Sequence, residues 1–96
     1  MRENGMVSAE LVIRNELGIH MRPAKHLCMR AVEYPCKVTL EKGNGNYNAK
    51  SVLSVLSAGV KYGETILLKC DGEKEELALK ELVAFISSGL GEEIKQ

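Results

Sequence analysis

Hydrophobic and polar residues alternate along two stretches of the chain, with the period of a strand that has one buried face. In residues 6–14 the alternate residues predicted to face the core are apolar: Val7, Ala9, Leu11 and Ile13. Residues 36–42 alternate in the same way, and a turn at residues 43–46 leads to a short return strand over 47–49, because Asn-Gly favours positive φ. Residues 65–70 are apolar enough to indicate a central strand.

Apolar residues recur every three or four positions in three other stretches, which is typical of helices. The first helix is predicted over residues 21–33, with Pro23 in its first turn, where an N–H would have no partner. Its predicted buried stripe is Ala24, Leu27, Cys28, Ala31 and Val32. His26 lies beside this stripe and is expected to be structural.

A short helix is predicted over residues 51–58, with the Ser51 hydroxyl as its N-cap and Gly59 at its end. The last helix is predicted over residues 74–87 and is ended by Ser88-Gly89. Its inward residues are expected to be Leu79, Leu82, Val83 and Ile86, helped by Phe85. Residues 92–96 are largely polar, and no role is predicted for them.

The predicted order β-α-β-β-α-β-α indicates an α+β fold of two layers, in which one face of a sheet packs against helices and the other faces water. Short connections favour antiparallel pairing. We expect one domain over residues 6–92, with flexible tails at 1–5 and 93–96.

Composition narrows the classes of function. Thirteen basic and thirteen acidic residues give zero net charge, which argues against a nucleic-acid partner. Membrane insertion is not expected, since no apolar run is long enough to span a bilayer, and a cytoplasmic location follows by default. The three cysteines (Cys28, Cys36 and Cys70) form no disulfide framework and are expected to be buried apolar residues.

The most informative stretch is residues 17–24, where His20 precedes a helix start and Arg22 follows two residues later. A histidine ring titrates near neutral pH and can act as a nucleophile that carries a phosphoryl group. Unpaired N–H groups and the helix dipole favour an anion there, and Arg22 offers forked donors to phosphate oxygens. Gly18 allows the tight turn that leaves the ring accessible.

Plainer interpretations stay open at this point. A lone histidine near a helix start is more often a cap or an ordinary surface residue. A metal site is not predicted and no cofactor is expected, because the spacing of His20, His26 and Cys28 matches no zinc pattern.

Ser51 is the second candidate, because a phosphate at that helix start would add nearly two negative charges. The alternative is that Ser51 only caps the helix. Val52, Leu53 and Leu56 supply more apolar surface than so short a helix can bury, so Leu53 is expected to be exposed in a docking patch near His20.

Two segments together resemble a known family. Gly18-Ile19-His20-Met21-Arg22-Pro23-Ala24 resembles the active-site signature of HPr, the histidine-containing phosphocarrier of the phosphoenolpyruvate-dependent phosphotransferase system. Residues 50–59 resemble the family's second signature, around its regulatory serine. The resemblance extends over about residues 6–92.

The resemblance implies an open-faced sandwich with a four-stranded antiparallel sheet of order 1-4-2-3 and helices on one face. His20 would accept a phosphoryl group on Nδ1 from phospho-enzyme I and pass it to an enzyme IIA domain, with Arg22 as phosphate ligand. Ser51 would be the target of HPr kinase/phosphorylase. The protein would be a monomeric stoichiometric carrier rather than an enzyme.

The docking residues implied are Gly18, Met21, Pro23, Ala24, Val52, Leu53 and Leu56. Met21 replaces a usual small residue, and Met29 and Val32 stand where enteric carriers have lysine. The ending over residues 85–92 resembles the nitrogen-related branch of the family, which feeds regulatory enzyme IIA proteins.

Three alternatives remain at this stage: that nitrogen-related carrier, a regulatory protein that responds only through Ser51, and a ferredoxin-like module that binds metal or RNA. The lack of a Cys-x-x-Cys loop, the few aromatic residues and the neutral charge weigh against the ferredoxin-like module.

Overall fold

The computed structural model describes residues 6–93. Its elements follow the predicted order: β1 (Met6–Val12), α1 (Met21–Ala31), β2 (Lys37–Lys42), β3 (Gly45–Asn48), α2 (Val52–Ser57), β4 (Thr65–Asp71) and α3 (Glu75–Ser87). The predicted tails, apart from residue 93, lie outside the described residues.

The four strands form one antiparallel sheet of order β1-β4-β2-β3, which confirms the predicted α+β fold. β4 is central, as its apolar sequence predicts. Leu68 on β4 pairs with Ala9 on β1 and with Leu40 on β2, so these three side chains form one row across the sheet. Leu40 and Leu68 are completely buried, which places the core on this face.

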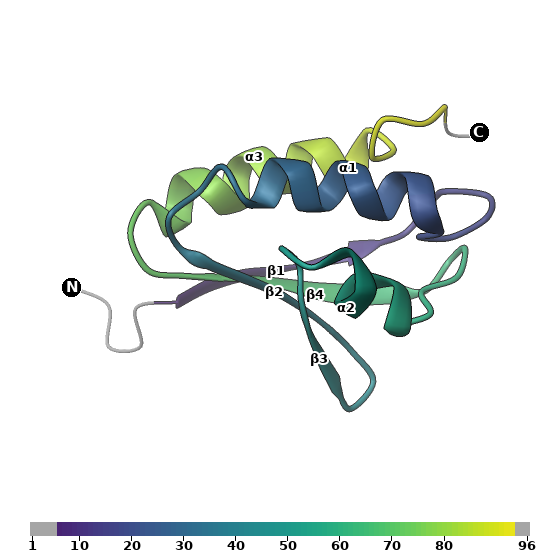
Figure 1. Ribbon diagram of the computed structural model, residues 1–96, viewed down its shortest axis with the longest axis horizontal. Coiled ribbons are helices and arrows are strands. Elements are labelled where there is room, and N and C mark those ends of the chain that lie inside the picture. The colour runs from purple at the N-terminus through teal and green to yellow at the C-terminus, as the bar shows by residue number, and fades with distance from the viewer. Residues whose placement is uncertain (1–5, 94–96) are drawn as a thin grey trace.

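Helices α1 and α3 lie side by side over the sheet, and α2 packs against α1 and β3 (Figure 1). The predicted stripe of α1 is buried at Ala24, Leu27, Cys28 and Ala31. Val32 was wrongly predicted to be buried, because α1 ends at Ala31 and the C-cap Val32 is 58% exposed. On α3 the most buried apolar residues are Ala78, Leu82 and Ile86, whereas Leu79, Val83 and Phe85 are partly buried.

Some helix and strand boundaries differ from the prediction, because backbone groups there form hydrogen bonds with loops or adopt turn conformations. β1 ends at Val12 because Ile13 bonds to the loop before β4: its N–H donates to the Glu64 carbonyl at 2.9 Å, and its carbonyl accepts from Gly63 at 2.7 Å. In the hairpin, Lys42 already pairs with Gly45, so the turn is shorter than predicted. The last helix begins one residue late, after Lys74, whose φ is +62°.

The loop between β1 and α1 is pressed against residue 60. The Ile19 N–H donates to the Val60 carbonyl at 3.0 Å, and Gly18 has a φ of +70°. A Cβ on Gly18 would lie 2.2 Å from the Val60 carbonyl oxygen. The absence of a side chain at Gly18 therefore sets how closely this loop, and His20 after it, approaches the core.

Replacing Gly18 with alanine is expected to destabilise the protein by roughly 2–5 kcal/mol, because the left-handed backbone and the clash with Val60 both add cost. Gly43→Ala is the matched control, since Gly43 has a similar φ of +59° and open space around it. It is expected to cost about 1–2 kcal/mol. Urea unfolding of both variants measures the difference, and equal losses would refute the close approach.

Candidate functional site

His20 is the N-cap residue of α1, as the Pro23 position predicts. Its backbone is extended, and its carbonyl accepts from the Ala24 N–H at 3.0 Å. The side chain makes no capping hydrogen bond and is 35% exposed. The ring is therefore held at the start of the helix and remains accessible from solvent.

The start of α1 offers donors to an anion. In helix geometry the N–H groups of Met21 and Arg22 have no acceptor within the helix, and Pro23 has no N–H. No acidic residue occupies the first turn, so nothing there competes with an incoming anion. Met21 and Arg22 are both exposed, whereas Pro23 and Ala24 are buried and face the core side of the helix start.

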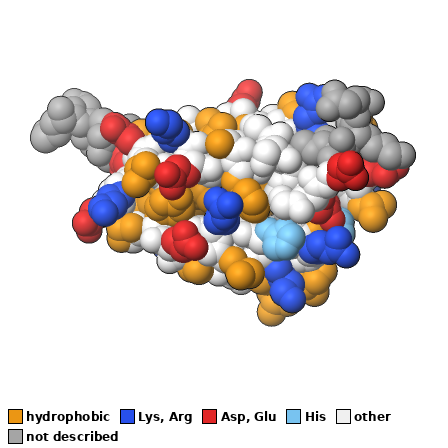
Figure 2. Space-filling view, turned by 90° about the horizontal axis from the view of Figure 1, so that it is seen from above, with side chains coloured by type: hydrophobic (Ala, Val, Ile, Leu, Met, Phe, Trp, Pro, Cys, Tyr) orange, Lys and Arg blue, Asp and Glu red, His pale blue; other side chains and the backbone are white. Residues whose placement is uncertain are grey.

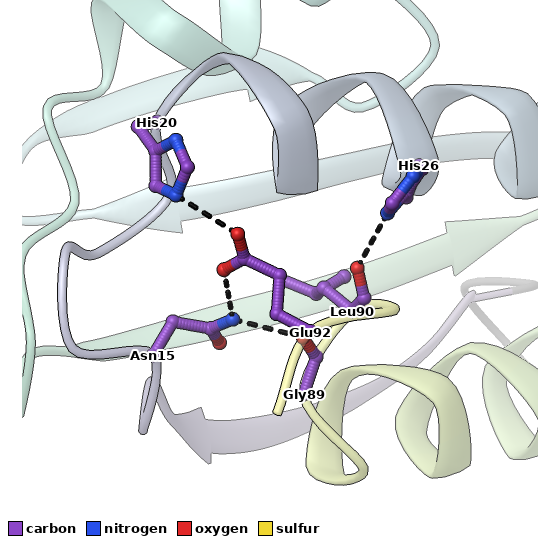
Figure 3. A network of polar contacts seen from close by, with 6 residues as sticks. All are labelled: Asn15, His20, His26, Gly89, Leu90 and Glu92. Carbon is purple, nitrogen blue, oxygen red and sulfur yellow. Dashed lines mark hydrogen bonds and ion pairs between the residues drawn. The ribbon is translucent and has the colours of Figure 1, made fainter. Parts of the chain in front are cut away.

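The second nitrogen of the His20 ring faces a residue that the sequence did not indicate. His20 Nε2 lies 3.1 Å from Glu92 Oε2, and Glu92 Oε1 accepts from Asn15 Nδ2 at 2.9 Å (Figure 3). Residues 15, 20 and 92 come from the loop after β1, the start of α1 and the segment after α3. Glu92 was predicted only to begin a largely polar tail, and its contact with His20 was not predicted.

No spacing rule could have found Glu92, which is 72 residues from His20. The one local signal is Gly89-Leu90-Gly91, an apolar residue between two glycines directly after a helix. That pattern is typical of a sharp reversal anchored by a buried side chain. Asn15 was not singled out from the sequence, although its side chain is almost completely buried.

His26 has a structural contact, as predicted: its Nδ1 lies 2.8 Å from the Leu90 carbonyl oxygen. It also lines a shallow hollow beside the start of α1, together with His20, Met21, Arg22, Lys25 and Met29. On this helix-covered side of the molecule, hydrophobic side chains intermingle with lysine and arginine around a histidine (Figure 2). The surface is therefore mixed rather than simply basic.

Helix α2 lies near the end of α1 that carries His20 (Figure 1). Ser51 is its N-cap, as predicted, and the hydroxyl oxygen accepts from the Ser54 N–H at 3.2 Å. Leu53 is 80% exposed, which confirms its predicted exposure, while Val52 and Leu56 are half-buried. Gly18 is buried, so any contribution it makes to docking is indirect.

The cysteines are free thiols in the core, as predicted. Burial, reinforced by the neighbouring Cys36, raises the pKa of the Cys70 thiol to about 12. A thiolate nucleophile is thus disfavoured at Cys70.

Within residues 6–93 no group of three or more His, Cys, Asp and Glu side chains is arranged to hold a metal ion. In the same part of the chain, no helix is long and apolar enough to cross a membrane.

Residues 7–88 match the family described as PTS HPr component phosphorylation site. The chain belongs to this HPr family. It is 32% identical over 83 residues to the phosphocarrier protein HPr of Borreliella burgdorferi, covering 86% of this chain and 96% of that protein. The structure resembles HPr-C-His from Thermoanaerobacter tengcongensis, with a TM-score of 0.86, 36% identity, and coverage of 92% of this chain and 99% of that one.

A third relative is larger. The multiphosphoryl transfer protein of Salmonella typhimurium is 36% identical over 90 residues, which cover 91% of this chain. The chain spans about a quarter of that protein's length, 24%. An HPr unit of this kind therefore also occurs within a longer polypeptide.

For this HPr-family chain, Ser51→Ala is expected to lower the free energy of unfolding by about 1 kcal/mol, because the Ser54 N–H loses its acceptor. Ser51→Asp keeps an acceptor at the N-cap and is expected to retain near wild-type stability. The matched control is Ser57→Ala on the same helix, where the hydroxyl donates to the Ser54 carbonyl and is exposed. Denaturant titration compares the three, and equal stability of Ser51→Ala and Ser57→Ala would exclude the cap.

Proposed function

We propose that this protein is a phosphocarrier of the phosphotransferase system, which accepts a phosphoryl group on His20 from phospho-enzyme I and transfers it to an enzyme IIA domain. The observation that carries the proposal is an accessible His20 at the N-terminus of α1 in a chain of the HPr family. The protein then acts stoichiometrically and is regenerated by its partners, so it is a carrier and not an enzyme.

The chemistry requires a lone pair on a ring nitrogen that faces solvent. Nε2 is directed at Glu92, which leaves Nδ1 as the nucleophile. The Nδ1 lone pair forms the new N–P bond while the bond from phosphorus to the donor breaks, and that electron pair stays on the donor. The N–H groups of Met21 and Arg22 and the Arg22 guanidinium are suited to bind the phosphoryl oxygens.

Incubation with enzyme I and phosphoenolpyruvate is expected to label wild-type protein with one acid-labile phosphoryl group, because a phosphohistidine N–P bond hydrolyses in acid. His20→Ala is expected to take no label. His26→Gln is the control, since it removes the other histidine and keeps a donor for the Leu90 carbonyl. Absence of label on the wild type with enzyme I of its own organism would refute the carrier function.

The docking surface is proposed to combine exposed apolar residues of α1 and α2. Met21, Met29 and Val32 are exposed on α1 and at its C-cap, and Leu53 is exposed on α2. An exposed apolar group gains free energy when a partner covers it, whereas the protein alone gains nothing from it. Half-buried Val52 and Leu56 would form the edge of this surface.

Leu53→Asp is expected to weaken transfer from phospho-enzyme I at least about tenfold, seen as a higher KM, because a charge replaces a central apolar contact. Leu77→Asp is the matched control: Leu77 is also an exposed leucine and lies at the start of α3, away from His20. It is expected to change KM less than about twofold. Equal effects in steady-state transfer assays would exclude a docking role for α2.

Ser51 is proposed as a regulatory phosphorylation site for HPr kinase/phosphorylase. Its half-buried hydroxyl lies two residues before the exposed Leu53, so a phosphate would place about two negative charges beside the docking surface. Repulsion and desolvation would then oppose a partner that covers Leu53. A protein that responds through Ser51 alone is less well supported, because His20 remains accessible.

A second candidate function is that of a carrier in the nitrogen-related branch of the family, which feeds regulatory enzyme IIA proteins. Met29 and Val32 are exposed and apolar at positions where enteric carriers have lysine. A partner that binds these residues needs a different surface from one that recognises lysines. This observation favours the nitrogen-related branch. The ferredoxin-like alternative has no support, because residues 7–88 match HPr. The monomeric state remains a prediction.

A further inference from the structure

The chain reverses sharply after α3. Three consecutive residues have positive φ: Gly89 (108°), Leu90 (55°) and Gly91 (84°). Leu90 is completely buried despite this conformation, which is unfavourable for a residue with a side chain. We call residues 89–92 the C-terminal hook. Such a strained segment persists only when its surroundings hold it in place.

Two side chains bond to backbone carbonyls of the hook. Asn15 Nδ2 donates to the Gly89 carbonyl at 2.8 Å, and His26 Nδ1 donates to the Leu90 carbonyl at 2.8 Å (Figure 3). The fit is close at Gly91, where a Cβ would lie 2.5 Å from His26 Nδ1. The hook thus connects α3 both to the loop after β1 and to α1, and it fixes the backbone that carries Glu92.

The donors around Glu92 can be assigned from their chemistry. The Gly89 carbonyl can only accept, so the Asn15 atom that faces it must be the NH2 group, which also faces Glu92 Oε1. Glu92 therefore accepts from Asn15 through one oxygen. Its other oxygen faces His20 Nε2 at 3.1 Å, so this ring nitrogen is the one that carries the proton.

We propose that Glu92 is a positioning residue for phosphoryl transfer, which holds His20 in the Nε2–H tautomer and so keeps the Nδ1 lone pair available. This inference rests on the proposed carrier function of His20. Glu92 lies at the opposite ring nitrogen from the one that is attacked, so its carboxylate does not occupy the phosphoryl site.

The same contact also acts after transfer. When Nδ1 forms the N–P bond and the donor keeps the electron pair of the broken bond, Nε2 retains its proton and the ring gains positive charge. The Glu92 carboxylate offsets that charge through a charge-assisted hydrogen bond. Glu92 thereby stabilises the phosphorylated ring as well as the reactive tautomer.

Glu92→Gln is the decisive variant, because the single oxygen of an amide replaces the two carboxylate oxygens that face Asn15 and His20. Asn15 is buried and must keep an acceptor, whereas the partly exposed His20 ring can turn to water. The oxygen of the new side-chain amide will therefore face Asn15, and the amide NH2 will face His20 Nε2. That arrangement requires an acceptor at Nε2 and favours the Nδ1–H tautomer, in which Nδ1 has no lone pair with which to attack phosphorus.

The readout is ¹⁵N NMR of the two histidine rings, with the rate of labelling by enzyme I and phosphoenolpyruvate measured in parallel. In the wild type, His20 is expected as Nε2–H and His26 as Nδ1–H. In Glu92→Gln, His20 is expected to shift toward Nδ1–H and labelling to slow about tenfold or more. His26 should keep its tautomer, which shows that the hook remains folded.

Glu93→Gln is the matched control, since it removes the same charge from the adjacent, exposed residue. It should change neither the tautomer nor the rate. An Nε2–H tautomer and a wild-type rate in Glu92→Gln would overturn the positioning role while leaving the carrier intact. If wild-type protein takes no label, the carrier function itself fails, but the NMR comparison still tests whether Glu92 sets the tautomer.

Discussion

The buried amide of Asn15 is the interaction on which the arrangement of the site depends. An NH2 group taken out of water must find acceptors, and Asn15 finds them in the Gly89 carbonyl and in Glu92. Those two acceptors belong to the far end of the chain. Satisfying the buried NH2 group of Asn15 therefore brings the segment after α3 against the loop that carries His20.

That arrangement also explains how so small a domain fixes the His20 ring in an open hollow at its surface. The ring is fixed from the protein side by the helix start and by Glu92, and its remaining face is open to solvent. Ala24 and Leu27 on α1 are completely buried, so the helix that follows His20 is anchored in the core although the ring itself is accessible. The carrier function proposed for His20 requires this combination of a fixed ring and an accessible nitrogen.

The errors of prediction lie where tertiary contacts replace local rules. Val32 fits the helical stripe by spacing, yet α1 stops before it and the side chain is exposed. Ile13 continues the alternation of β1, yet its backbone pairs with the loop at residues 63 and 64 instead of a strand. In both cases the spacing of apolar residues continues past the residue at which the element ends.

The sequence by itself determined the order of the elements, the apolar faces of α1 and the strands, the cap at Ser51 and the position of His20 at a helix start. These features follow from periodicity, from proline and glycine geometry and from capping chemistry, all of which act over a few residues. Only the tertiary structure decided that Glu92 and Asn15 belong to the site. Glu92 lies 72 residues from His20 and 77 from Asn15, and no local pattern encodes which buried donor will meet which distant acceptor.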